Sequence, residues 1–223
     1  MQFTYHPKCK SEFLEIEADT YKYLFKARRQ KISDEIYFRN LDDSYIYLYK
    51  VIDIDKRKAR CELISKEEKI VENPNKLHLI WCIVDPKTIE KSLASLNELG
   101  VYKITFLYCD YSQKNFKINF DKLEKILINS SSQCGRSSII KLDASNSLEE
   151  FLQNNNNVYA LNFSSQLIDE KKDEITKLVV GCEGGFSKDE ENRFDKGKIV
   201  GFKSNLILKS ETAIISAASK ILI

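Results

Sequence analysis

The chain has 223 residues, a formal net charge of +2 and 43% hydrophobic residues, so it can bury a sizeable core and is not expected to be disordered. This charge excludes a global basic field for nucleic acid but leaves room for a local basic patch. The chain has six scattered cysteines, two histidines, no long apolar run and no leader-like start. These features predict a reduced, cytoplasmic protein without a metal site or a membrane segment.

The first 70 residues are expected to form mostly β-structure. Short runs rich in Ile, Tyr, Val and Phe predict strands at residues 2–5, 35–39, 44–53 and 58–64. A helix that is capped by Asp19 or Thr20 and ends near Gln30 is expected to interrupt them. Short strands at this spacing indicate a small β-barrel as a first domain, residues 1–70.

After a polar linker at residues 66–76, continuous apolar runs alternate with helical spacing. Asp85 and Pro86 are expected to start one helix and Gly100 to end it. Strands are expected at residues 77–84, 101–108, 158–163, 175–180 and 199–202, with a short one starting at Ile139, and further helices at 120–128 and 211–223. This alternation indicates a parallel α/β sheet in a second domain, residues 71–223.

The segment 180–190 is the best candidate for a ligand site. Gly181, Gly184 and Gly185 follow an apolar run and precede a helix start. The spacing fits neither the dinucleotide fingerprint nor the P-loop. Ser187 and Glu190 predict a capping box, which uses the amides that a phosphate would need. The turn suits a neutral or zwitterionic ligand, although a plain strand-to-helix turn explains these residues equally well.

A second segment, 205–213, has a similar plan. An apolar bend at residues 206–208 precedes Ser210, which is expected to cap the last helix, and Glu211 suits the positive end of its dipole. Taken singly, this segment is a capped terminal helix.

Together, the two segments resemble the RsmE family of ribosomal RNA uridine-N3 methyltransferases in the SPOUT superfamily. That family carries Gly-Pro-Glu-Gly-Gly-Phe-Ser-x-x-Glu and then Ile-Leu-Arg-x-Glu-Thr-Ala. The matching residues are Gly181, Glu183, Gly184, Gly185, Phe186, Ser187, Glu190, Ile207, Leu208, Glu211, Thr212 and Ala213. Weaker matches occur at residues 97–101, at 133–136, and at Arg28 with Ser33 and Asp34.

The chain also departs from the family pattern. Cys182 replaces the proline of the first motif, and Lys209 replaces the arginine of the second, which keeps the charge but loses a bidentate fork. Ser204, Leu206 and Tyr111 stand where the family often has glycine or arginine.

The resemblance implies an α/β fold in which a small PUA-like β-barrel precedes a SPOUT-type trefoil-knotted parallel α/β domain. It implies that S-adenosylmethionine binds in the knot, with its adenine between Leu206 and Leu208. The implied cofactor-binding residues are Leu161, Asn162, Gly181, Gly184, Gly185, Asn205, Leu206, Leu208 and Ser210.

The implied reaction is methylation of uracil N3 in 16S ribosomal RNA of the small subunit. N3 carries a proton and lies on the Watson–Crick edge, so the target base must be unpaired. Glu183 is the implied general base or hydrogen-bond partner, and Arg136 and Lys209 would stabilise the uracil anion or a phosphate. As alternatives, Glu183 satisfies turn amides and Arg136 is a surface cation at a helix end.

Lys26, Arg28, Arg29 and Arg136 are the expected RNA contacts, although a solvated helix face explains the first three as well. The family also implies a homodimer, which the apolar final helix fits no better than core packing does. Two alternatives stay open: a related methyltransferase that acts on transfer RNA or another RNA site, and an RNA-binding module that has lost catalysis.

Overall fold

The computed structural model describes all 223 residues and divides into two compact units. The first unit contains Met1–Glu72 and Ile128–Ser138, and the second contains Asn73–Leu127 and Ile139–Ile223. Helix α3 (Phe120–Cys134) begins in the second unit and ends in the first. A single boundary near residue 70 therefore leaves out a segment that returns to the first unit. None of the helices has the length and hydrophobicity needed to cross a membrane.

The first unit is built on a five-stranded sheet with the order β1-β3-β4-β5-β2. Its strands are β1 (Thr4–Tyr5), β2 (Phe13–Glu17), β3 (Glu35–Arg39), β4 (Tyr45–Ile54) and β5 (Lys58–Glu68). The pairs β3–β4, β4–β5 and β2–β5 are antiparallel, and β1 runs parallel to β3. Because the edge strands β1 and β2 do not pair with each other, the small barrel that the strand spacing predicts is a half-barrel.

A helix covers this sheet, as predicted, but its ends differ. Helix α1 (Ala18–Tyr21) continues as a π-helix, η1 (Lys22–Ala27). Its N-cap is Glu17 rather than Asp19 or Thr20, and no side chain forms a capping hydrogen bond with the first amides of the helix. Tyr21, Leu24 and Phe25 are buried in the core of this unit.

The second unit contains a six-stranded parallel sheet with the order β11-β9-β10-β6-β7-β8. The strands are β6 (His78–Cys82), β7 (Lys103–Leu107), β8 (Lys141–Ser145), β9 (Tyr159–Leu161), β10 (Lys177–Val180) and β11 (Ile199–Val200). The central strand β6 has four fully or almost fully buried residues after His78, which confirms the prediction of a strand covered on both faces.

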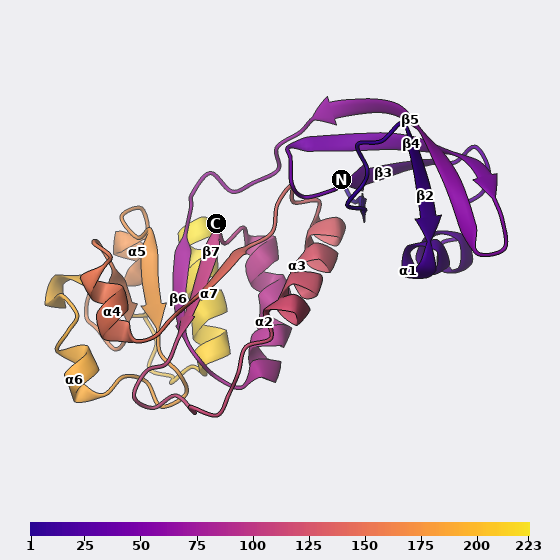
Figure 1. Cartoon of the computed structure of the whole chain (residues 1–223). Helices are drawn as coiled ribbons and strands as arrows, with labels where there is room; N and C mark the ends of the chain where they lie inside the picture. The colour runs from indigo at the N-terminus through magenta and orange to yellow at the C-terminus, as the bar shows by residue number, and fades with distance from the viewer. The chain divides into compact units, whose positions relative to one another are not determined.

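Helices cover both faces of this sheet. They are α2 (Pro86–Leu99), α4 (Leu148–Gln153), α5 (Ile168–Lys171), α6 (Lys188–Glu191) and α7 (Ser210–Leu222), with a short 3₁₀ turn η2 (Lys196–Lys198). Figure 1 shows α2 and α7 side by side, with α4 and α6 on the other side of β6. As predicted, Asp85 caps α2 and Gly100 ends it with φ +92°.

Candidate functional site

A cavity of about 390 Å³ opens in the second unit where three neighbouring parallel strands end. Its walls come from residues 161–164 after β9, residues 180–186 after β10, and residues within 202–213 that lead from β11 into α7. Ligands of open α/β sheets bind at the carboxyl ends of the strands. The position of this cavity therefore agrees with a ligand site.

The glycines after β10 let the backbone approach the cavity closely. A Cβ on Gly184 would lie 2.9 Å from the Cβ of Tyr111, and a Cβ on Gly181 would lie 3.2 Å from the Cα of Gly185. Gly185 has φ +71°, in the left-handed region that glycine adopts without strain. A side chain would therefore clash at position 184, strain the backbone at 185 and crowd the turn at 181.

The predicted capping box holds the far end of this turn. The Ser187 hydroxyl accepts from the Glu190 amide at 3.2 Å, and the Glu190 carboxylate accepts from the Ser187 amide at 2.9 Å. Glu190 also accepts from the Asp110 amide at 2.9 Å, and the Ser187 hydroxyl donates to the Asp110 carboxylate. Burial raises the pKa of Glu190. The capping box thus engages the amides of Ser187 and Glu190, and the Glu190 carboxylate lies where an anion would bind, so this helix start does not favour a phosphate.

Ser210 joins the turn to the last helix. Its hydroxyl donates to the Gly181 carbonyl at 2.6 Å and accepts from the Trp81 indole at 2.9 Å. The N-cap of α7 is Lys209, so the prediction that Ser210 caps this helix is wrong. The Ser210 hydroxyl instead accepts the hydrogen bond of the Trp81 indole, which is fully buried and needs an acceptor.

The outer wall of the cavity is apolar. Leu206 is 74% exposed and Ile207 is 84% exposed, although both line the cavity. On the opposite wall, the Asn162 amide group donates to Glu191 at 2.7 Å, and its oxygen accepts from the Phe163 amide at 2.9 Å. Because the Asn162 side chain is engaged, backbone groups are the polar surface that this loop offers a ligand.

Glu183 is the only carboxylate among the lining residues, and no lysine or arginine lines the cavity. Cys182 also lines it, with its sulfur 3.4 Å from that of Cys109. The hydrogen bond between these thiols and burial raise the pKa of Cys182, so it stays a thiol at neutral pH. The two histidines lie elsewhere, and the chain has no group of three or more metal-ligating side chains.

The structure brings together most of the residues predicted to bind the cofactor. Those that line the cavity are Leu161, Asn162, Gly181, Gly184, Gly185, Leu206, Leu208 and Ser210. Glu183, which was predicted as a catalytic residue, lines it as well. Asn205 and Lys209 are exposed on the same loop but do not line it.

Arg136 does not line this cavity either. It belongs to the first unit and is only 4% exposed, with its Nη2 atom 3.5 Å from the Glu72 carboxylate. The interpretation of Arg136 as a surface cation is therefore wrong, because the residues after α3 fold back against the first unit.

Of the predicted RNA contacts on the first helix, Arg28 lines a separate cavity in the first unit, whereas Lys26 and Arg29 are exposed outside it. Some lining residues lie outside both candidate segments, among them Phe163, Ser164 and Phe202, and neither they nor the bond of Ser210 to Trp81 were predicted. Phe163 and Ser164 follow directly after a buried strand, which is a signal that could have identified them.

Comparisons with known proteins agree with this geometry. A model described as an RNA methyltransferase domain matches residues 71–222, and one described as an RNA methyltransferase PUA domain matches residues 16–64. The chain is 37% identical to ribosomal RNA small subunit methyltransferase E of Helicobacter pylori (strain ATCC 700392 / 26695), over 98% of each chain. The protein of that name from Aquifex aeolicus is 29% identical, and the alignment covers 87% of this chain and 88% of that protein.

Two solved structures share the fold. A Legionella pneumophila protein solved with bound S-adenosylmethionine superposes with a TM-score of 0.81 at 24% identity, and the alignment covers 98% of this chain and 95% of that one. A ribosomal RNA small subunit methyltransferase E from Neisseria gonorrhoeae bound to S-adenosyl methionine gives a TM-score of 0.79 at 18% identity, with the same coverage. These likenesses confirm the predicted fold, and the two family models confirm the order of a PUA unit followed by a methyltransferase unit.

Proposed function

This chain belongs to the ribosomal RNA small subunit methyltransferase E family, and we propose on that premise that it methylates N3 of a uridine in 16S ribosomal RNA with S-adenosylmethionine. The observation that carries the proposal is the cavity at the carboxyl ends of β9, β10 and β11. It is built from the glycine turn and the apolar bend that match the family motifs.

The lining of the cavity fits this cofactor. S-adenosylmethionine has no phosphate, and the cavity has no lysine or arginine to hold one. Leu206 and Leu208 offer apolar contacts for an adenine, and the backbone of the glycine turn offers amides and carbonyls for its edge. Asn205 is proposed to contribute through the same loop. When bound, the cofactor supplies an electrophilic methyl group.

The protein must hold the target base and accept its proton. Glu183 is exposed and is the only carboxylate that lines the cavity. We therefore propose that it either removes the proton from uracil N3 as a general base or accepts a hydrogen bond from it. Lys209 lies on the adjoining loop and carries a free cation that favours an anionic uracil. The burial of Arg136 and its ion pair with Glu72 support a structural role, so no chemical step is assigned to it.

Methyl transfer to unmodified small ribosomal subunits tests this proposal. We expect Glu183→Gln to lower kcat roughly a hundredfold or more, the usual effect of losing a general base, with affinity for S-adenosylhomocysteine unchanged. Glu124→Gln is the matched control, because Glu124 is exposed on α3 and lies outside the cavity. Equal activity of both variants would contradict the role of Glu183.

The position of the methyl group is tested separately. Mass mapping of 16S ribosomal RNA from a deletion strain should show the loss of one 3-methyluridine, and expression of this chain should restore it. An unchanged 16S map with a change in transfer RNA would favour the alternative substrate. Failure to bind S-adenosylhomocysteine in calorimetry would favour an RNA-binding module without catalysis.

We further propose that the protein is a homodimer, on the strength of the family resemblance. The apolar face of α7 is already used within the chain, since Ile214, Ala217 and Ala218 belong to its own core. The exposed apolar side chains left for a partner in this unit include Phe163, Leu206 and Ile207. Light scattering that gives the mass of one chain would contradict the dimer. The trefoil knot also stays a prediction.

A further inference from the structure

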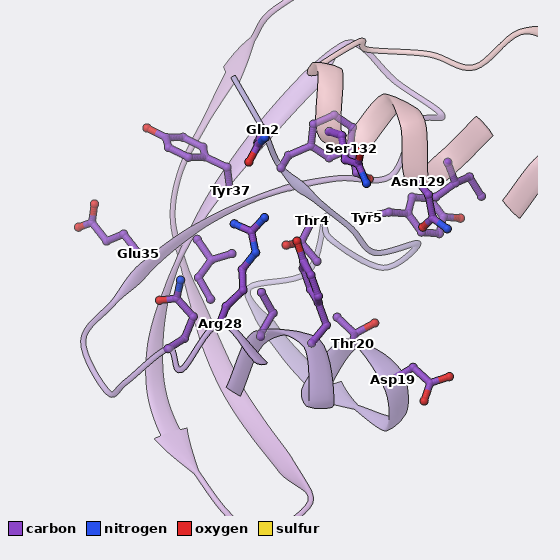
Figure 2. Close-up of a pocket in the computed structure, with 17 residues that line it drawn as sticks. Gln2, Thr4, Tyr5, Asp19, Thr20, Arg28, Glu35, Tyr37, Asn129 and Ser132 are labelled. Carbon is purple, nitrogen blue, oxygen red and sulfur yellow. The ribbon is translucent and has the colours of Figure 1, made fainter. Parts of the chain in front are cut away.

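The first unit contains a second cavity that the proposed chemistry does not use. Its volume of about 520 Å³ falls within the roughly 300–1,000 Å³ of small-molecule sites. Its walls come from residues 2–5, the helical segment 19–30, the start of β3 and the end of α3, all within the first unit. Figure 2 shows the Arg28 guanidinium in the middle of this cavity, between Glu35 and Thr4.

The backbone of the π-helix η1 puts Arg28 in this position. The Arg28 amide donates to the Tyr23 carbonyl, five residues earlier, at 2.9 Å. The guanidinium lies over the Tyr23 ring, 4.9 Å from its centre. π-Helical turns occur often at functional sites, and attraction to the face of the Tyr23 ring restrains the guanidinium. The sequence therefore builds a stacked Arg28–Tyr23 platform at the cavity wall.

The guanidinium of this platform still has its hydrogen-bond donors available for a ligand. The Arg28 side chain forms no ion pair or hydrogen bond in the structure, although the carboxylates of Asp19 and Glu35 line the same cavity. Asp19 pairs with Lys22 instead, at 3.0 Å. With Asp19 paired to Lys22, the carboxylate of Glu35 offsets the charge of Arg28, so the cavity has no excess positive charge for a bare phosphate.

The rest of the lining suits a flat polar ring. Its floor is apolar, with the buried side chains of Phe3, Leu24 and Ile36. Its rim carries amides and hydroxyls from Gln2, Thr4, Thr20, Gln30, Asn129 and Ser132. A carboxamide offers a donor and an acceptor side by side, which is also what the edge of a nucleobase presents.

We propose that this cavity holds one unstacked nucleobase of the RNA, at a nucleotide other than the one that is methylated. The base stacks on the Arg28–Tyr23 platform, and the rim amides contact its edge. The identity of the RNA rests on the proposed function, whereas the chemistry of the cavity does not. A single-stranded segment of the substrate is thereby held by the first unit.

The cavity is tested directly by NMR of the full chain with labelled methyl groups. Leu24, Ile36 and Ile128 line it and report on ligands. Adenosine and uridine 5′-monophosphates at millimolar concentration should shift these signals by ring currents, and inorganic phosphate should not. Absence of shifts with both nucleotides would overturn the proposal. Equal shifts with phosphate would overturn the role of the base.

A matched pair of variants separates the cavity from simple charge. Arg28→Gln and Arg29→Gln each remove one exposed cation, but only Arg28 lines the cavity. We expect Arg28→Gln to weaken binding of a single-stranded RNA dodecamer about tenfold more than Arg29→Gln, because it also removes the stacked platform. Both variants should reduce the salt dependence of the RNA-binding constant by the same amount, because each removes one positive charge. Equal affinities would overturn the proposal.

Tyr23 provides an internal check. Tyr23→Ala should weaken RNA binding as Arg28→Gln does, and Tyr23→Phe, which keeps the ring, should retain it. Neither variant should change affinity for S-adenosylhomocysteine. If the wild-type chain shows no methyl transfer while nucleotides still shift the cavity signals, the proposed function fails and the nucleobase site stands.

Discussion

At the scale of single residues, the glycines at 181, 184 and 185 meet three different physical demands. Gly181 leaves room for the backbone of Gly185, Gly184 leaves room for the side chain of Tyr111, and Gly185 adopts a positive φ. The density of glycine in the sequence predicts a tight turn. Which neighbour occupies the space at each position depends on loops that are distant in sequence.

Gly184→Ala should displace the turn, since the new Cβ would lie 2.9 Å from that of Tyr111. We expect affinity for S-adenosylhomocysteine to fall about tenfold, the effect of an overpacked contact worth about 1–2 kcal/mol. Calorimetry measures this, and the double variant Gly184→Ala, Tyr111→Gly should recover most of the loss. Gly197→Ala is the control, because its Cβ would meet only Asp195 at 3.4 Å.

Ser210→Ala should destabilise the protein by about 1–3 kcal/mol, because the buried Trp81 indole loses its acceptor. Denaturant unfolding followed by tryptophan fluorescence reports this directly, since Trp81 is the only tryptophan. Ser216→Ala, on the same helix and partly buried, should change stability by less than about 0.5 kcal/mol. Similar losses in both variants would count against the Trp81–Ser210 tie.

At the scale of elements, local signals predicted the long elements, the start of α6 and several short strands, but not α5 or β2. Asp85, Pro86 and Gly100 mark both ends of α2 because capping depends on adjacent residues. Helix α5 has four residues and is too short to show a period, whereas α6, of the same length, is marked by its capping box. Strand β2 alternates exposed and buried residues over only five positions, and its pairing with β5 is what makes it a strand.

His78 at the start of β6 should make stability depend on pH. Burial lowers the pKa of His78 from 6.5 to about 4, and its Nε2 atom lies 2.8 Å from the Thr105 hydroxyl on β7. Between these two pH values the unfolded chain binds the proton more readily, so stability falls as the pH is lowered through this window. Between pH 7 and pH 4, we expect the wild-type chain to lose up to about 2 kcal/mol more than His78→Gln. Equal losses in urea unfolding would contradict this.

At the scale of the whole molecule, the chain has two separate hydrophobic cores. The first core contains residues such as Leu14, Phe38 and Tyr49, and the second is centred on β6. Separate cores favour separate unfolding transitions. The segment 128–138 belongs to the first unit although it follows residues of the second, and no local pattern marks that return.

S-adenosylhomocysteine should therefore stabilise only the second unit. At a concentration of about 100 times its Kd, it should add about 2.7 kcal/mol to the stability of the unit that binds it. Scanning calorimetry should show one transition move upward, and Gly184→Ala should move less at the same concentration. A shift confined to the transition of the first unit would contradict the assignment of the cofactor site.

The sequence by itself determined the family, the order of a β-rich unit before a parallel α/β unit, and the turn that forms the candidate cofactor site. These properties depend on spacing among neighbouring residues, so they can be identified without the fold. Only the tertiary structure decided that Ser210 bonds to Trp81, that Arg136 is buried against Glu72, and that the Arg28–Tyr23 platform faces a cavity. Those contacts depend on how distant segments pack, which no local pattern in the chain specifies.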